Sequence, residues 1–533
     1  MSALGKASRS SGDTSEGMAG EANPRDLRAR ALLFAAWVAI TLMLVAQHVF
    51  WRDEVRAFSF ALQGDNVVDM LRRLHGEGHP AIWYLLLRGA HAIVPVREVL
   101  PAVNYLLALA AAALFAFRAP FRLPMIALVL FSSFSLTEYP VAARNYSITV
   151  LLLFALAHLY PRYRDRGPAI GLLLALLCNT NVPACLMAAA FLLFWLVELV
   201  GEEGLRWNRK YGLFVLNAAL AAIGAAICFV TVYPTMHDAA VVHLAGGITP
   251  GTIGRILFLP AYSWWALTPP GLPSTPLVGA LFAAVVVGCV FGLVRAPGAF
   301  LSSLAVLVTF ELLFQLVYYP TSYRHQALYL VYLVTMYWLV EQGRGGRWNG
   351  RGRLAAWLPP LGEAGRLIFT FMLALQVLNS AGAIGSLRRY PFSHARDLAE
   401  LLKHQGLENA VLIADPDMML EPMPYYSGNP IYLMREQRWR NYVHFTTKVR
   451  QELNPDDFLA DARALRARTG RPVVIVFQHR LDPNRPAYRK ESVRLWWFSA
   501  NPDQVRRFFA GTRRLASFGP AVTDESYDVY QLR

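Results

Sequence analysis

The sequence predicts a mainly helical protein of the multi-pass membrane class, in which a bundle of about eleven transmembrane helices precedes a soluble α/β domain. Apolar residues make up 55% and charged residues 16% of the 533 positions, against roughly 45–50% and about 25% in soluble domains. The apolar residues gather in segments long enough to cross the hydrocarbon core as helices. After residue 386 charges are frequent and no long apolar run occurs.

The first thirty residues are polar, rich in Ser and Gly, and end in Arg25, Arg28 and Arg30. This leader is too long for a removable signal peptide, so residues 31–50 are predicted to be a retained first span. We expect residues 1–30 to be a disordered cytoplasmic N-terminus.

The transmembrane domain is predicted to cover residues 31–385. Its spans are expected at 31–50, 99–117, 123–139, 146–160, 168–182, 183–200, 211–233, 275–295, 299–319, 326–341 and 364–385. The shorter apolar segment 80–95 begins and ends at a proline and is expected to dip into the outer leaflet without crossing.

The net charge of +15 is concentrated in the short loops that this topology places on the side of the N-terminus. That is the positive-inside pattern, so the charge indicates membrane topology and not a nucleic-acid partner. We expect a cell (inner or plasma) membrane protein with a cytoplasmic N-terminus. The four cysteines lie in apolar stretches without a CxxC pair, which argues against disulfide and zinc frameworks.

Residues 386–533 are predicted to form an extracytoplasmic α/β domain. Helix-like stretches at 393–405, 455–468 and 501–511 alternate with short β-branched or apolar runs at 410–414, 473–477 and 528–532. No glycine-rich nucleotide-binding loop occurs in this region.

Candidate chemistry begins in the first external loop, residues 51–98. Asp53 and Glu54 form an acidic pair directly after the first span. A carboxylate there could accept a proton from an attacking hydroxyl or bind a metal ion, and a solvated helix end is the plain alternative. An amphipathic stretch at 57–75 is expected to lie in the membrane interface, and a His-Pro element at 79–80 leads into an aromatic and leucine-rich segment.

This order of elements resembles the first external loop of GT-C glycosyltransferases, and especially glycosyltransferase family 39, the protein mannosyltransferase and aminoarabinose transferase group. The resemblance covers residues 31–340 and is strongest in the first loop. It implies an enzyme that passes a monosaccharide from a polyprenyl-phosphate carrier to an acceptor at the outer face. In that family the Asp of the acidic pair is the proposed general base, which corresponds to Asp53. Glu54 matches its neighbour, and His79 matches the His of the His-Pro element.

Two later elements extend the resemblance. Arg144 and Tyr146 stand at the start of a span where the family tends to place an Arg and an aromatic, and Arg324 and His325 match an Arg-Tyr or Arg-His element that opens a late span. The resemblance implies that these four residues and His79 bind the substrate. Arg144 could clamp phosphate bidentately, and a snorkelling interface Arg is the alternative there.

Other polar and aromatic groups leave alternatives open. His237, Asp238 and His243 are loosely spaced and are interpreted as ordinary loop residues rather than metal ligands. Residues 179–181 (Asn-Thr-Asn) are either a turn or a hydrogen-bonding site for sugar, and Trp264 and Trp265 fit an aromatic belt better than a sugar platform. No metal site is assigned and no cofactor is certain, although a divalent cation is compatible with the acidic pair.

The sequence is compatible with a glycan, a lipid or a protein as the acceptor. The first loop lacks the double proline often seen after the His, and residues 386–533 do not resemble the β-trefoil of eukaryotic protein mannosyltransferases. The expected partners are a polyprenyl-phosphate sugar donor, one of these acceptors and membrane lipids. The alternative function is a transporter or flippase, or a non-catalytic binder, of a lipid-linked sugar. No internal repeat of the kind common in transporters is found.

Overall fold

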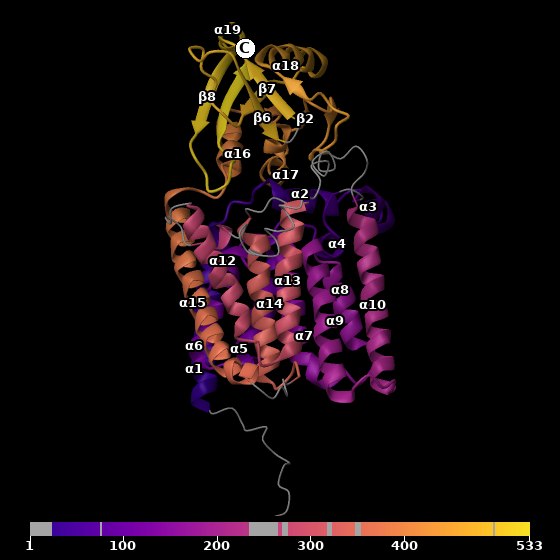
Figure 1. Ribbon diagram of the computed structural model, residues 1–533. Coiled ribbons are helices and arrows are strands. Elements are labelled where there is room, and N and C mark those ends of the chain that lie inside the picture. The colour runs from indigo at the N-terminus through magenta and orange to yellow at the C-terminus, as the bar shows by residue number, and fades with distance from the viewer. Residues whose placement is uncertain are drawn as a thin grey trace, which may run out of the picture.

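The computed structural model describes residues 24–74, 77–233, 265–268, 275–316, 322–346, 353–493 and 496–533. A tall helical bundle carries an α/β domain at one end, here called the domain end (Figure 1). The predicted fold class is therefore confirmed. His237, Asp238, His243, Trp264 and the side chain of Trp265 lie outside the described residues.

The bundle helices coincide in order with the predicted apolar segments. They are α1 (Pro24–Gln47), α5 (Val99–Arg118), α6 (Leu123–Leu130) with the π-helix η1 (Phe134–Glu138), α7 (Tyr146–Tyr163), α8 (Ala169–Cys178), α9 (Val182–Glu203), α10 (Arg209–Val232), α12 (Pro276–Phe291), α13 (Pro297–Leu316), α14 (Tyr323–Glu341) and α15 (Arg353–Arg389). Within the described ranges, 6 helices (α1, α5, α9, α10, α13 and α15) are long and apolar enough to cross a membrane. The total number of crossings stays a prediction.

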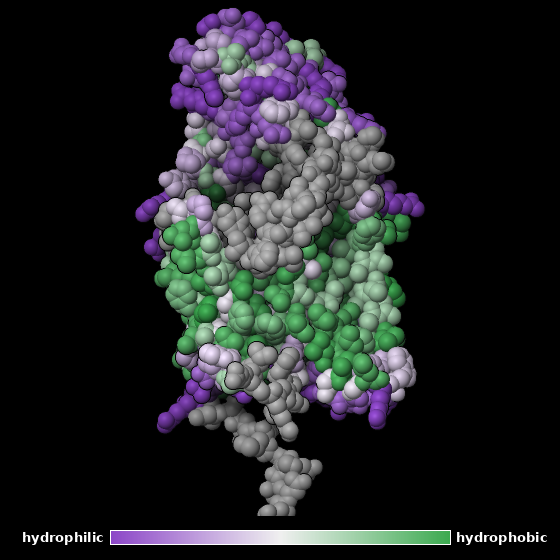
Figure 2. Space-filling view, in the orientation of Figure 1, coloured by the Kyte–Doolittle hydropathy of each residue, from purple (hydrophilic) through white to green (hydrophobic). Residues whose placement is uncertain are grey.

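The outer surface of the bundle is suited to lipid. On the face of the molecule seen in Figure 2, a hydrophobic belt crosses the helices, and hydrophilic residues gather at both ends. A chain with such a belt is a multi-pass membrane protein, because only lipid tails solvate so broad an apolar surface.

Glycine allows close helix crossings in the bundle. A Cβ added to Gly365 of α15 would lie 2.0 Å from the amide nitrogen of Gly292 at the end of α12, and one added to Gly224 of α10 would lie 2.5 Å from Cα of Ala175 on α8. Helices in lipid associate through such close backbone contact because they gain no hydrophobic free energy from one another.

The basic loops lie at the end of the bundle opposite the C-terminal domain, where α1 begins (Figure 1). Arg164, after α7, pairs with Glu198 at 2.7 Å and with Glu202 at 2.5 Å. Arg344, after α14, donates a hydrogen bond to the carbonyl of Pro161 at 3.5 Å. The charge asymmetry predicted from the sequence is thus present in the fold, and the assignment of this end to the cytoplasm stays a prediction.

Three short helices cover the domain end between α1 and α5. They are α2 (Arg52–Ala61), α3 (Val67–Arg73) and α4 (Ile82–Ile93). Helix α4 corresponds to the segment 80–95, and its 12 residues reach about 18 Å at 1.5 Å per residue. This is shorter than the roughly 30 Å of hydrocarbon, and the prediction that this segment does not cross the membrane stays a prediction.

The C-terminal domain is built from small sheets flanked by helices. Its helices are α16 (Ala395–His404), the 3-10 helix η4 (Asp417–Leu420), α17 (Met423–Tyr426), α18 (Pro455–Thr469) and α19 (Pro502–Gly511). Its central sheet has the order β1-β5-β9-β8, formed by β1 (Val411–Asp415), β5 (Val473–Phe477), β9 (Tyr527–Leu532) and β8 (Thr512–Phe518). Strands β1 and β5 are parallel and fully buried, with Val411 opposite Val473.

Two smaller sheets complete the domain. One pairs β2 (Tyr432–Leu433) with β3 (Arg438–Trp439), and the other has the order β4-β7-β6, formed by β4 (Glu452–Leu453), β7 (Trp496–Ala500) and β6 (Tyr488–Val493). The turn from β1 through η4 into α17 contacts α2, which brings the C-terminal domain next to the acidic pair of the first loop.

Candidate active site

The acidic pair lies in the first turn of α2, which begins at Arg52 after the N-cap residue Trp51. Consecutive residues of an α-helix point about 100° apart around its axis. Asp53 and Glu54 are therefore directed to different surroundings although they are neighbours in the sequence. Asp53 retains 34% of its side-chain exposure, whereas Glu54 retains 0%.

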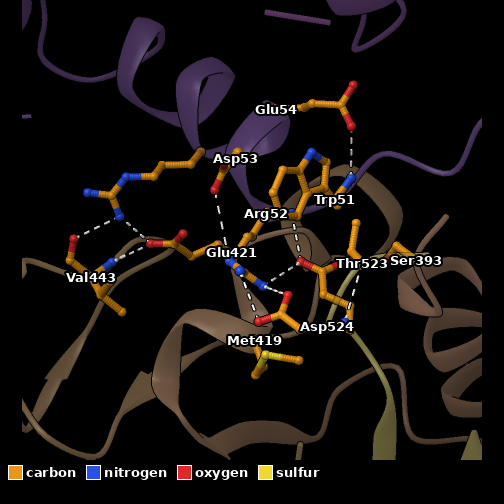
Figure 3. A network of polar contacts seen from close by, with 12 residues as sticks. Trp51, Arg52, Asp53, Glu54, Ser393, Met419, Glu421, Val443, Thr523 and Asp524 are labelled. Atoms are coloured by element: carbon orange, nitrogen blue, oxygen red, sulfur yellow. Dashed lines mark hydrogen bonds and ion pairs between the residues drawn. The ribbon is translucent and has the colours of Figure 1, made fainter. Parts of the chain in front are cut away.

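Glu54 is buried between α1 and the segment before α7. One carboxylate oxygen accepts a hydrogen bond from the amide of Ala143 at 2.6 Å, and the other accepts one from the amide of Trp51 at 3.1 Å. His48 Nε2 lies 2.9 Å from the same carboxylate. Glu54 thereby fixes the backbone next to Arg144, and Figure 3 shows it turned toward Trp51, away from Asp53. These contacts support a positioning role for Glu54.

Asp53 is surrounded by cationic side chains. Arg144 Nη1 donates a hydrogen bond to its carboxylate, and Arg324 Nη1 lies 3.7 Å from the same oxygen. Burial alone would raise the pKa of Asp53, but the neighbouring guanidinium groups, led by Arg144, outweigh burial and hold this pKa well below its ordinary value. Asp53 is thus a carboxylate in the resting protein.

His79 joins the same cluster through Arg144. Arg144 Nη2 lies 2.8 Å from His79 Nε2, and because Arg can only donate, Nε2 is the acceptor. Burial, assisted by the charge of Arg144, lowers the pKa of His79 to about 3. His79 is therefore a neutral imidazole with its proton on Nδ1, and it orients the guanidinium of Arg144.

Aromatic rings hold the two arginines in place. The guanidinium of Arg324 lies 4.9 Å from the ring centre of Trp51, and that of Arg144 lies 6.0 Å from the ring centre of Tyr146. The rings of Tyr146 and His325 meet edge to face at 5.9 Å. Arg324 Nε also lies 3.4 Å from Glu138 at the end of η1.

The structure therefore gathers the candidate residues around one point. Asp53, His79, Arg144, Tyr146, Arg324 and His325 come from four separate parts of the sequence, and their side chains form a chain of contacts at the domain end. Glu54 lies outside this cluster and holds the backbone next to Arg144 by accepting a hydrogen bond from the amide of Ala143.

A cavity of about 160 Å³ opens beside Asp53. Its wall includes the predicted residues Asp53, His79 and Arg144. It also includes residues that the sequence did not single out, namely Arg52, Arg56, Ala57, Glu77, Trp83, Tyr84, Asn145, Glu421 and Phe445. Arg56 follows Asp53 by three positions, so helical periodicity could have placed both on one face of α2. No comparable signal connects Glu421 and Phe445 to the first loop.

Arg56 links the first loop to the C-terminal domain inside this cavity. Its guanidinium donates to both oxygens of Glu77, at 2.7 and 2.6 Å. It also donates to Glu421 and, at 2.9 Å, to the carbonyl of Val443. Figure 3 shows Glu421 and Val443 on the same side of the network as Asp53. The C-terminal domain is thus part of the cavity wall.

A second set of contacts attaches the domain to the start of α2. Arg52 donates from Nη1 to Asp524 at 2.5 Å and from its backbone amide to Glu525 at 2.9 Å. Glu525 also accepts from Ser393 at 2.5 Å. Burial raises the pKa of Glu525 to about 8.

Residues 179–181 do not line the cavity. Asn181 accepts a hydrogen bond from the amide of Ala184 and so caps α9, and Asn145 donates to the carbonyl of Thr180. Residues 179–181 therefore form a turn between α8 and α9. In the part of the chain that the structure describes, no group of three or more His, Cys, Asp or Glu residues could hold a metal ion.

Comparison with known proteins gives similarities of overall fold. No protein-family model and no curated protein matches the sequence. The structure is similar to ArnT from Cupriavidus metallidurans, solved bound to undecaprenyl phosphate, with 12% identity and a TM-score of 0.45 over 94% of this chain and 97% of that one. It is also similar to the arabinofuranosyltransferase AftD from Mycobacteria, with 15% identity and a TM-score of 0.33 over 96% of this chain and 42% of AftD.

Proposed function

We propose that this protein is a membrane glycosyltransferase, which moves a monosaccharide from a polyprenyl-phosphate carrier to an acceptor hydroxyl at the domain end of the bundle. The observation that carries the proposal is the position of Asp53, a carboxylate on a cavity wall between Arg144 and Arg324. A transfer from a lipid phosphate requires a base for the acceptor and cations for the departing phosphate. Both lie here within one hydrogen-bonded cluster.

The proposed reaction is a single displacement at the anomeric carbon. The acceptor oxygen forms a bond to that carbon while the bond from the carbon to the carrier phosphate oxygen breaks with its electron pair. The acceptor proton passes to Asp53, and the negative charge of the leaving phosphate is neutralised by Arg144 and Arg324. The carrier phosphate is the leaving group, and the glycosylated acceptor is the product.

The resting ion pair provides a way to couple donor binding to base activation. Arg144 is bonded to Asp53 in the resting protein. A donor phosphate offers a guanidinium a bidentate partner of higher charge, so binding would draw Arg144 away from Asp53. Release from this partner raises the pKa of Asp53 toward the range of an effective base. Asp53 would then become reactive only after the donor is in place.

The side of the membrane follows from the positions of the basic loops. Arg164 and Arg344 lie at the end opposite the cluster. The positive-inside rule assigns that end to the cytoplasm. We therefore place the reaction at the outer face, beneath an extracytoplasmic C-terminal domain.

The test measures how much radiolabelled sugar is released from its polyprenyl-phosphate carrier. Purified wild-type protein and its Asp53→Asn variant are incubated with radiolabelled polyprenyl-phosphate sugars and membrane extract. Asp69→Asn is the matched control, because Asp69 is a carboxylate of the same loop that pairs with Arg73 outside the cavity. We expect release from at least one carrier by wild-type protein and Asp69→Asn, and none by Asp53→Asn.

Two results would oppose the proposal. Turnover that survives in Asp53→Asn would remove Asp53 from the mechanism. Binding of a labelled carrier without release by any of the three proteins would favour a transporter or a non-catalytic binder of a lipid-linked sugar.

A further inference from the structure

The segment between η1 and α7 carries Arg144 without the support of a helix. Residues 139–145 follow the end of η1 at Glu138 and precede the start of α7 at Tyr146, and all of them are buried. Buried backbone outside a helix has N–H and C=O groups that no regular pattern satisfies, so these groups need other partners. The position of Arg144 therefore depends on the groups that bond this segment from outside.

The side chain of Asn104 forms three of these bonds. Its amide nitrogen lies 2.9 Å from the carbonyl oxygen of Tyr139, 3.1 Å from that of Pro140 and 3.2 Å from that of Ala142. The nitrogen carries two N–H groups, so one of them is shared between two carbonyls. Carbonyls can only accept, which fixes the orientation of the amide. Asn104 is 0% exposed, so water does not compete for these bonds.

Asn104 is one of two polar residues in α5 before Arg118 at its end, and the other is its neighbour Tyr105. A polar side chain within an apolar span usually faces the protein interior and serves a function there. Asn104 does not line the cavity beside Asp53. It can act on the reaction only through the backbone that it holds.

The segment bonded by Asn104 contacts both arginines of the cluster. The backbone amide of Arg144 donates to the carbonyl of Ala142 at 2.8 Å. The hydroxyl of Tyr139 donates to the backbone carbonyl of Arg324 at 2.9 Å. Asn104 thus bonds the two residues through which this segment reaches Arg144 and Arg324.

Glu54 and Asn104 hold the segment from two different helices. Glu54 of α2 accepts a hydrogen bond from the amide of Ala143 at 2.6 Å. Asn104 of α5 donates to carbonyls that precede this residue. One side chain satisfies an N–H group and the other satisfies C=O groups, so neither can replace the other.

We infer that Asn104 is a positioning residue of the phosphate clamp formed by Arg144 and Arg324. It determines where the two guanidinium groups meet the phosphate of the donor. The inference rests on the proposed function and extends it to a residue outside the cavity. A displacement of about 1 Å in a positioning element can cost about a hundredfold in rate. The three bonds of Asn104 prevent such a displacement of the backbone next to Arg144.

The test compares Asn104 with a buried asparagine at the other end of the bundle. Asn104→Ala removes every bond from this side chain to the segment, and Asn104→Asp keeps its shape but can donate at most one hydrogen bond. Asn217→Ala is the matched control. Asn217 of α10 is also 0% exposed and donates to the carbonyls of Gly167 and Leu213 at 2.9 and 2.7 Å. Turnover, the dissociation constant for bare polyprenyl phosphate in nanodiscs and the unfolding temperature are measured for each protein.

We expect Asn104→Ala to lower turnover and to weaken binding of bare polyprenyl phosphate, each at least about tenfold. Asn104→Asp should show smaller losses of the same kind. Asn217→Ala should lower the unfolding temperature as Asn104→Ala does, but its turnover and carrier affinity should stay within about twofold of wild type, because distant sites act independently.

Equal losses of turnover in the two alanine variants would overturn the inference, because activity would then follow stability and not the position of the clamp. Wild-type turnover in Asn104→Ala would overturn it as well. If Asn104→Ala does not fold, Asn104→Asp is judged by the same criteria.

A chemical measurement separates this inference from the proposed function. Arg144 is 8% exposed, and the rate at which phenylglyoxal modifies it, followed by mass spectrometry, reports how firmly its guanidinium is held. We expect modification at least about threefold faster in Asn104→Ala than in wild type or Asn217→Ala, because local opening exposes the group. If wild-type protein binds no polyprenyl phosphate but this difference is found, the proposed donor class is wrong and the positioning role is supported. Equal rates in all three proteins would overturn the positioning role.

Discussion

The Glu54→Gln substitution exchanges one carboxylate oxygen for an amide nitrogen at a place where both backbone neighbours are donors. The two oxygens of Glu54 accept from the amides of Trp51 and Ala143 and are contacted by His48 Nε2. Whichever way the glutamine turns, its NH₂ group faces one of these N–H groups. At least one buried backbone N–H then lacks an acceptor, at about 1–3 kcal/mol. We expect the variant to be destabilised by about 1–3 kcal/mol.

The assay is thermal unfolding of the purified protein in detergent, with Asp53→Asn as the matched control on the same helical turn. Asp53 is partly exposed at 34%, whereas Glu54 is fully buried, so loss of the Asp53 carboxylate should destabilise the protein less than loss of Glu54. Hydrogen exchange at the amide of Ala143 should be faster in Glu54→Gln, because this amide loses its acceptor. Turnover should fall as well, since the backbone next to Arg144 is released. A Glu54→Gln protein that unfolds like wild type but has no turnover would refute this reasoning and indicate a direct role in the chemistry.

Three further perturbations test other parts of the structure. Burial raises the pKa of Glu525 from an ordinary 4.5 to about 8. The protonated carboxyl therefore contributes its full stabilisation below about pH 4.5, and this stabilisation is lost as the pH rises toward 8. The unfolding temperature of the wild-type protein should fall over this pH range, and that of Glu525→Gln should fall less steeply. Gly365→Ala should destabilise the bundle by about 1–3 kcal/mol because its Cβ would meet Gly292 at 2.0 Å, whereas Gly385→Ala on the same helix meets nothing within 4 Å and should unfold like wild type. Arg324→Gln should weaken binding of bare polyprenyl phosphate about tenfold or more, as expected for loss of a charged hydrogen bond, and unchanged carrier affinity would exclude Arg324 from the phosphate clamp.

The sequence by itself determined where the helices of the bundle lie. A backbone in hydrocarbon must satisfy its hydrogen bonds within each segment, so a long apolar run has one regular solution, and its position can be read locally. The predicted segments at 99–117 and 211–233 accordingly coincide with α5 and α10. The same holds for the runs at 473–477 and 528–532, which form the neighbouring strands β5 and β9.

The sequence also supplied most of the cluster around Asp53, but only through the resemblance of the first loop. Nothing in local periodicity says that Arg144 and Arg324 approach the same carboxylate. The structure brings them together because α7 and α14 both begin at the domain end, next to α2. The ion pairs themselves then fix the distances within the cluster.

Only the tertiary structure separated the roles of neighbouring residues and brought in the C-terminal domain. Asp53 and Glu54 both carry a carboxyl group, but they point about 100° apart around the axis of α2. Asp53 therefore faces the cavity, and Glu54 is buried in the bundle. Arg56 and Glu421 are 365 positions apart. Their contact depends on how a complete domain docks on a complete bundle, and that information is distributed over both surfaces rather than contained in any segment of the chain.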